Sequence, residues 1–133
     1  MASVQSYSHN VSGEREFGFA QAIKTGETIY VSGQLSHDDK GNFVGPDDFD
    51  TQIKQTFANL DKVLDHFGVT RNQVVQNTVF VVNLRKYNNA VAAAHLKYFG
   101  NHRPTSTTVG AEALFFSGQL IEINVTIRTD LPA

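Results

Sequence analysis

The sequence predicts an α+β domain in which two helices pack on one face of a single mixed sheet. Segments with the period-two alternation of strands are interleaved with two segments that have helical periodicity, in the order β-β-α-β-α-β-β. Both helical segments end at a glycine, and the last strand segment has one fully apolar face. The two helices are therefore expected to lie side by side over that apolar face.

Residues 27–35 predict the first well-defined strand. Alternate positions on one of its faces are Ile29, Val31, Gly33 and Leu35. Residues 18–24 are the expected partner strand, with a turn at Thr25-Gly26. Residues 1–16 are mostly polar and are expected to form a lead-in.

The first helix is expected to begin after Pro46 and to stop at Gly68. Three carboxylates at its start, Asp47, Asp48 and Asp50, suit the unpaired backbone amides of a helix N-terminus. Apolar residues then recur at spacings of three and four: Ile53, Phe57, Leu60, Val63, Leu64 and Phe67. This pattern is typical of an amphipathic helix.

The second half of the chain predicts a strand over 74–84, a helix over 87–99, and strands over 106–109 and 119–128. In the last strand an apolar face alternates with a polar one, which carries Glu122, Asn124 and Thr126. The helices should cover the apolar face, so the polar face is left for water or for another subunit. A carboxylate on a rigid strand is a sound platform for a functional site.

The composition fits one domain over residues 1–133 and excludes several classes of function. There is no cysteine, hence no disulfide and no thiolate site. The formal net charge of −2 disfavours a nucleic-acid partner, and no apolar run has the ~20 residues of a membrane span. The N-terminus lacks the features of a secretory signal, so we expect a cytoplasmic protein.

Short motifs give little support for metal or nucleotide chemistry. The five histidines make no HExxH pair or compact cluster, and no Walker loop, GxGxxG or GxSxG occurs. Ser32-Gly33-Gln34 closes a strand, where the glycine either relieves crowding at a bulge or lets a ligand approach the backbone. The sequence leaves these two interpretations open.

Five motifs occur in order: Phe19-Ala20-Gln21-Ala22, Ile29-Tyr30-Val31-Ser32-Gly33-Gln34, Asn77-Thr78-Val79-Phe80, Phe99-Gly100-Asn101-His102-Arg103-Pro104 and Ile121-Glu122-Ile123. Together they resemble the RidA/YjgF family, also called the endoribonuclease L-PSP family. The resemblance implies a chorismate-mutase-like fold, a homotrimer and ligand clefts between subunits. Its best-known members hydrolyse 2-imino or enamino acids to 2-keto acids and ammonia, without metal or organic cofactor.

The resemblance also implies roles for individual residues. Glu122 corresponds to the family's water-positioning glutamate, and Ser32 and Gly33 to a retained part of the pocket. The family's carboxylate-binding arginine is replaced by Ser106, and its pocket tyrosine by Phe19. We therefore expect Glu122 as the catalytic residue, no metal ligand, and a substrate-binding set of Ser106, Phe19, Ser32, Gly33 and Thr108.

No other cation within one chain is a simple substitute for the missing arginine. Arg103 lies about 10 Å from Ser106 along an extended chain, and on the opposite face if the strand is continuous. Arg128 shares the face of Glu122 but lies about 20 Å away along the strand. Because a serine has no charge, a neutral or differently shaped ligand fits better than a small imino acid.

These observations support three hypotheses about the function of the protein. The leading hypothesis is a trimer that binds a small molecule between subunits and acts as a hydrolytic enamine or imine deaminase with an altered substrate. The alternative is a non-catalytic binding or scaffold trimer, which the loss of the arginine and the tyrosine favours and the presence of Glu122 opposes. Ribonuclease activity is the weakest hypothesis, because the chain has no basic patch.

Overall fold

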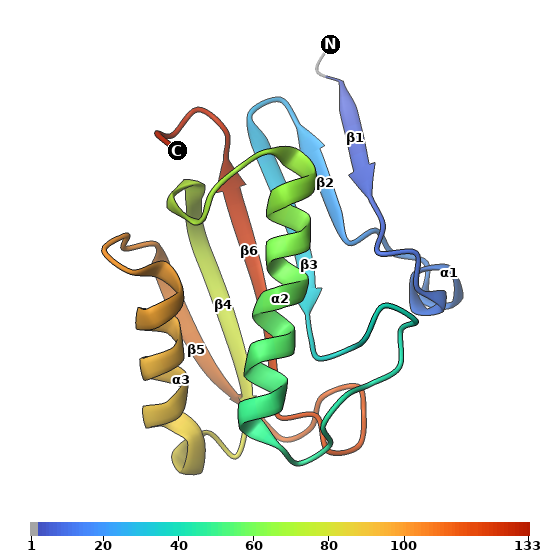
Figure 1. Ribbon diagram of the computed structural model, residues 1–133, viewed down its shortest axis with the longest axis vertical. Helices are drawn as coiled ribbons and strands as arrows, with labels where there is room; N and C mark the ends of the chain where they lie inside the picture. Colours follow the sequence, from blue (N-terminus) through green and yellow to red (C-terminus); the bar gives the residue numbers. More distant parts are fainter. Residues whose placement is uncertain (1–2) are drawn as a thin grey trace.

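The computed structural model describes residues 3–133 as a six-stranded sheet with two long helices on one of its faces (Figure 1). The elements are β1 (Val4–Tyr7), α1 (Ser12–Phe17), β2 (Ala22–Thr25), β3 (Thr28–Gln34), α2 (Phe49–Phe67), η1 (Arg71–Gln73), β4 (Val74–Val82), α3 (Leu84–Phe99), β5 (Thr105–Ala111) and β6 (Ile121–Arg128). The strand order is β1-β2-β3-β6-β4-β5. Among the strands of residues 3–133, β4 and β5 form the one parallel pair, so the sheet is mixed, as predicted.

The helix α2 begins and ends where the sequence places it. The Asp48 carboxylate accepts from the Thr51 backbone N–H at 3.2 Å and thereby caps the N-terminus. Gly68 ends the helix in the left-handed conformation, with φ of 65°, which glycine adopts at little cost.

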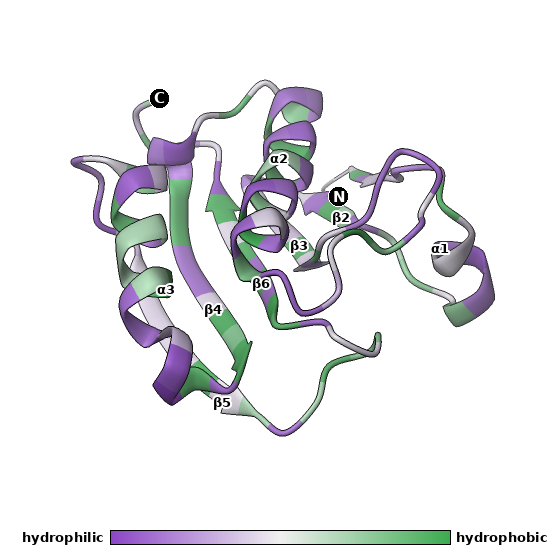
Figure 2. Cartoon of the chain, turned by 60° about the horizontal axis from the view of Figure 1, so that its bottom comes forward, coloured by the Kyte–Doolittle hydropathy of each residue, from purple (hydrophilic) through white to green (hydrophobic). Residues whose placement is uncertain are grey.

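The core lies between the helices and the apolar face of the sheet. In β6 the residues Ile121, Ile123, Val125 and Ile127 are all buried, and the polar residues between them are only partly covered. The prediction for the two faces of this strand is therefore confirmed. In contrast, β4 is hydrophobic at both ends and hydrophilic in its middle (Figure 2), where Asn77 is fully buried on the helix side.

The segment expected to be a polar lead-in contains two further elements. Strand β1 extends the sheet by pairing with β2, and α1 follows it at the edge of the molecule (Figure 1). Backbone pairing with β2 stabilises β1 although its side chains are mostly exposed, and side-chain periodicity gives no sign of such a strand. Within the described residues, none of the helices has the length and apolarity to cross a membrane.

Candidate functional site

Glu122 lies directly over Gly33, on the face of the sheet that the helices leave open. The β3–β6 register shifts between Val31 and Gln34, which marks a bulge at Ser32-Gly33. A Cβ atom at Gly33 would lie 2.6 Å from Glu122 Cδ and 2.9 Å from its Oε1. The glycine therefore does two things: it sits in a bulge, and it leaves room for the carboxylate of the neighbouring strand.

The surroundings of this carboxylate favour its neutral form. Phe80 of β4 is the cross-strand neighbour of Glu122, and Gly33 covers it on the β3 side. Burial raises the pKa of Glu122 above its ordinary value, because desolvation penalises the charged carboxylate. A carboxyl group with a raised pKa on a rigid strand is suited to accept and return a proton.

Ser32 and Phe19 belong to the same region of the chain. The Ser32 hydroxyl donates to the Ala20 carbonyl at 2.6 Å, and the Ser32 backbone N–H donates to the Gln21 carbonyl at 2.8 Å. These bonds tie the bulge to the segment 19–21. The Ser32 hydroxyl proton is therefore engaged in a hydrogen bond within the chain. Phe19 is 41% exposed and directly precedes Ala20, the residue that accepts this hydrogen bond.

A second group of candidate residues lines a groove between α3 and the edge strand β5. The groove has a volume of about 540 Å³. Its apolar lining comes from both elements and the loop between them, and includes Leu84, Val91, Leu96, Phe99 and Pro104. Its polar lining includes Arg85, Asn88, His95, His102, Arg103, Ser106 and Thr108. No acidic side chain lines the groove, so its charge is positive.

Ser106 is part of a hydrogen-bonded chain that runs from the groove into the core. Its hydroxyl lies 2.7 Å from Asn77 Oδ1, and Asn77 Nδ2 lies 2.9 Å from His95 Nε2. Asn77 is fully buried on β4, directly beside Ser106 in the parallel β4–β5 register. Neither Asn77 nor His95 was expected at the site, although a polar residue inside a valine-rich strand is a signal that the sequence does offer.

The cations near Ser106 differ from the sequence expectation. Arg103 was expected on the opposite face from Ser106 only if the strand were continuous. Strand β5 begins at Thr105, so this condition is not met, and Arg103 lines the groove together with Ser106. Arg85 on α3 lines the same groove and was not expected at all. Arg128 is engaged with Asp130 and Thr28, which agrees with its exclusion.

A model of the endoribonuclease L-PSP family matches residues 13–129, which is most of the chain. The chain belongs to this family. A RutC family protein from Sulfurisphaera tokodaii is 31% identical over 107 residues, covering 80% of this chain and 84% of that protein. A 2-iminobutanoate/2-iminopropanoate deaminase from Mus musculus is 28% identical over 96 residues, covering 72% of this chain and 70% of that protein.

The fold is also that of known L-PSP family structures. A crystal structure of a YjgF/YER057c/UK114 family member from Mycobacterium tuberculosis has a TM-score of 0.82 and covers 95% of this chain and 99% of that chain, at 24% identity. The predicted α+β architecture is therefore confirmed.

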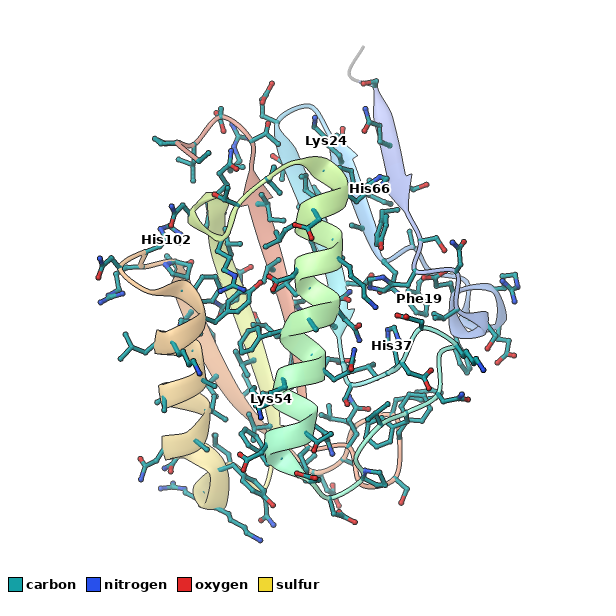
Figure 3. All side chains as sticks on the ribbon, viewed as in Figure 1. Phe19, Lys24, His37, Lys54, His66 and His102 are labelled. Atoms are coloured by element: carbon teal, nitrogen blue, oxygen red, sulfur yellow. The ribbon has the colours of Figure 1, made fainter. Side chains whose placement is uncertain are left out.

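Within a single chain, the candidate residues of this L-PSP family member form two groups rather than one. Glu122 and Gly33 lie on the open face of the sheet, whereas Ser106 and Thr108 face α3 on the helix side. In Figure 3, His102 of the groove lining lies in the loop after α3, and Phe19 lies near α1, toward the opposite edge of the sheet. One chain does not bring the catalytic candidate and the Ser106 group together.

Proposed function

We propose that this L-PSP family protein binds a small molecule between the subunits of a homotrimer and hydrolyses it as an imine or enamine deaminase with an altered substrate. The observation that carries the proposal is the Glu122 carboxylate, held over Gly33 on a rigid strand with a raised pKa. An ion-paired surface carboxylate would have a lowered pKa instead, so burial without a cation favours a proton-transfer role.

The division of the candidates into two groups supports a site shared by two subunits. Ser106 and the groove lie at β5, the edge strand of the described sheet next to β4, whereas Glu122 lies near the middle of the open face. A second copy that brings its β5 edge to this open face would join the two groups. The mouse relative named as a deaminase supports the reaction class.

The chemistry requires only water and one proton-transferring group. Water adds to the carbon of a protonated C=N bond, an iminium ion, while the Glu122 carboxylate accepts a proton from the water, which gives a neutral carbinolamine. The protonated Glu122 then returns this proton to the nitrogen. As the C–N bond breaks, the Glu122 carboxylate takes the hydroxyl proton, and ammonia and a carbonyl compound leave. An enamine first takes a proton at carbon to become the iminium ion.

Ser106 sets the expected difference from the better-known substrates. A hydroxyl has no charge and cannot hold a carboxylate with two parallel hydrogen bonds, as an arginine does. We therefore expect weak activity on 2-aminoacrylate-type imino acids, and a Ser106→Arg variant should increase it. The gain should be modest, because Phe19 still lacks the hydroxyl of a tyrosine.

Ammonia release from freshly generated imines, with and without a carboxylate, tests the proposal. Glu122→Gln should reduce the rate by roughly 100-fold, within the usual contribution of a general acid–base group. Glu16→Gln, an exposed glutamate on α1, is the matched control and should leave the rate unchanged. If the wild type releases no ammonia above the Glu122→Gln background from any of the imines, the protein is a binding trimer rather than an enzyme.

The assembly is tested separately by light scattering. A trimer has a mass of about 44 kDa, three times the 14.7 kDa of the chain. A stable monomer at micromolar concentration would contradict the shared site. Tight, salt-dependent RNA binding would instead revive the ribonuclease hypothesis.

A further inference from the structure

The side chain of Asn77 lies between Ser106 of β5 and His95 of α3, and it hydrogen-bonds to both. It is fully buried, so its amide must find both hydrogen-bond partners within the protein. Ser106 lies on its oxygen side at 2.7 Å and His95 on its nitrogen side at 2.9 Å. An amide oxygen only accepts and an amide nitrogen only donates, so the direction of one bond fixes the direction of the other.

The placement of Asn77 Oδ1 toward Ser106 and of Nδ2 toward His95 sets this direction, and a neutral His95 is compatible with it. Burial, reinforced by the nearby Arg103, lowers the pKa of His95, so the ring is uncharged at neutral pH. Its Nε2 atom can then accept from Asn77 Nδ2, with the ring proton on Nδ1. The Asn77 oxygen then faces Ser106, and the single hydroxyl proton of Ser106 is donated to this oxygen.

We propose that Asn77 and His95 determine the specificity of the groove by making Ser106 a hydrogen-bond acceptor, so that the ligand must place an N–H or O–H group on the Ser106 oxygen. This inference rests on the proposed function of the groove as a binding site. A carboxylate oxygen placed at Ser106 would face the lone pairs of the Ser106 oxygen and would be repelled. The position therefore accepts a hydrogen bond from the ligand, whereas an arginine there would donate one.

The charge of the groove indicates where a negative group of the ligand would lie. Arg85 from α3 and Arg103 from the loop before β5 are both exposed at the groove, and no carboxylate lines it. Among the described residues neither guanidinium forms an ion pair. The ligand class is therefore a small anion that carries a separate hydrogen-bond donor.

The proton position on His95 is a direct test, measured by long-range ¹H–¹⁵N NMR of the imidazole rings at pH 7.5. His95 should carry its proton on Nδ1. His102 is an internal control with the opposite tautomer, because its Nε2 lies 2.6 Å from the Val74 carbonyl, which can only accept. A proton on Nε2 of His95 would require the Asn77 amide to be reversed, and would overturn the inference.

Two isomeric probes test the polarity at Ser106 itself. The probe 3-(hydroxymethyl)benzoate can donate a hydrogen bond, and 3-methoxybenzoate, which has the same atoms, cannot. The wild type should bind the first more tightly, by about two- to ten-fold, the usual effect of one net hydrogen bond. Ser106→Ala should bring the ratio to one, and Ser6→Ala, an exposed serine on β1, should leave it unchanged.

The outcomes separate this inference from the proposed function. An equal affinity of the wild type for the two isomers, or no binding of either in the groove, overturns the polarity. Ammonia release that depends on Glu122 would persist in both cases, and only its loss contradicts the deaminase proposal. In Asn77→Leu the Ser106 proton is released, so affinity for 3-methoxybenzoate should rise relative to its isomer, a result that a purely structural Asn77 would not give.

Discussion

Replacing Gly33 by alanine should displace the Glu122 side chain while the backbone is retained. The added Cβ would lie 2.6 Å from Glu122 Cδ, so the carboxylate must move by about 0.8 Å to reach an ordinary contact of 3.4 Å. The backbone itself accepts alanine, because Gly33 is not among the glycines with positive φ. We expect a cost of about 1 kcal/mol in the free energy of unfolding, near the low end for overpacking, since the Glu122 side chain is flexible.

A double-mutant cycle measured by urea unfolding isolates this contact. In a Glu122→Ala background the space over Gly33 is free, so Gly33→Ala should become neutral or stabilising by up to about 1 kcal/mol, through the lost freedom of the unfolded chain. The difference between the two backgrounds is the predicted coupling.

The same substitution should also affect the proposed reaction. A displacement of about 1 Å can reduce a rate by roughly 100-fold when it misaligns a catalytic group. Ammonia release should therefore fall in Gly33→Ala although the protein remains folded. The inference that Gly33 leaves space for the Glu122 side chain would be contradicted by two results together: an equal stability cost of Gly33→Ala in the wild-type and Glu122→Ala backgrounds, and unchanged ammonia release.

Three further predictions concern stability. Glu122→Gln should be more stable than the wild type at neutral pH. Because the pKa of Glu122 is raised in the folded state, the stability of the wild type falls as the pH rises from the unfolded-state pKa through the folded-state pKa. Thermal unfolding near pH 4 should therefore show no difference between the two proteins. Gln52→Leu should cost about 2 kcal/mol in urea unfolding, because it leaves the buried Leu120 N–H unpaired and removes one of the two hydrogen bonds at each of the Gly45 and Gly118 carbonyls. Thr56→Val, one turn along α2, should instead gain about 1 kcal/mol, because the buried Thr56 hydroxyl has no hydrogen-bond partner among the described residues. Asp48→Ala should lower stability by about 1 kcal/mol through loss of the α2 cap, with Asp50→Ala as a control that changes it by less than half as much.

The order of the main elements, and the buried faces of α2 and β6, could be predicted from the sequence alone. Periodicity is a local property, so the apolar stripe of α2 and the alternation of β6 could be read without knowledge of any partner. The ends of α2 could also be predicted, because the aspartates at its start and Gly68 at its end act locally. Strand β1 was missed because its stability comes from backbone pairing with β2, which leaves no side-chain pattern.

The division of the candidate residues into two groups could not be predicted, because it depends on how the strands pair in the assembled sheet. Strand β5 begins with four small polar residues and has no apolar alternation, so its faces cannot be assigned from its own sequence. The parallel register with β4 sets Ser106 beside Asn77 and turns it toward α3, away from Glu122. The contact of Glu122 with Gly33 likewise depends on a bulge between strands nearly ninety residues apart. Such contacts depend on register between distant segments, and hydrogen bonding of the assembled sheet fixes register where the side-chain pattern does not.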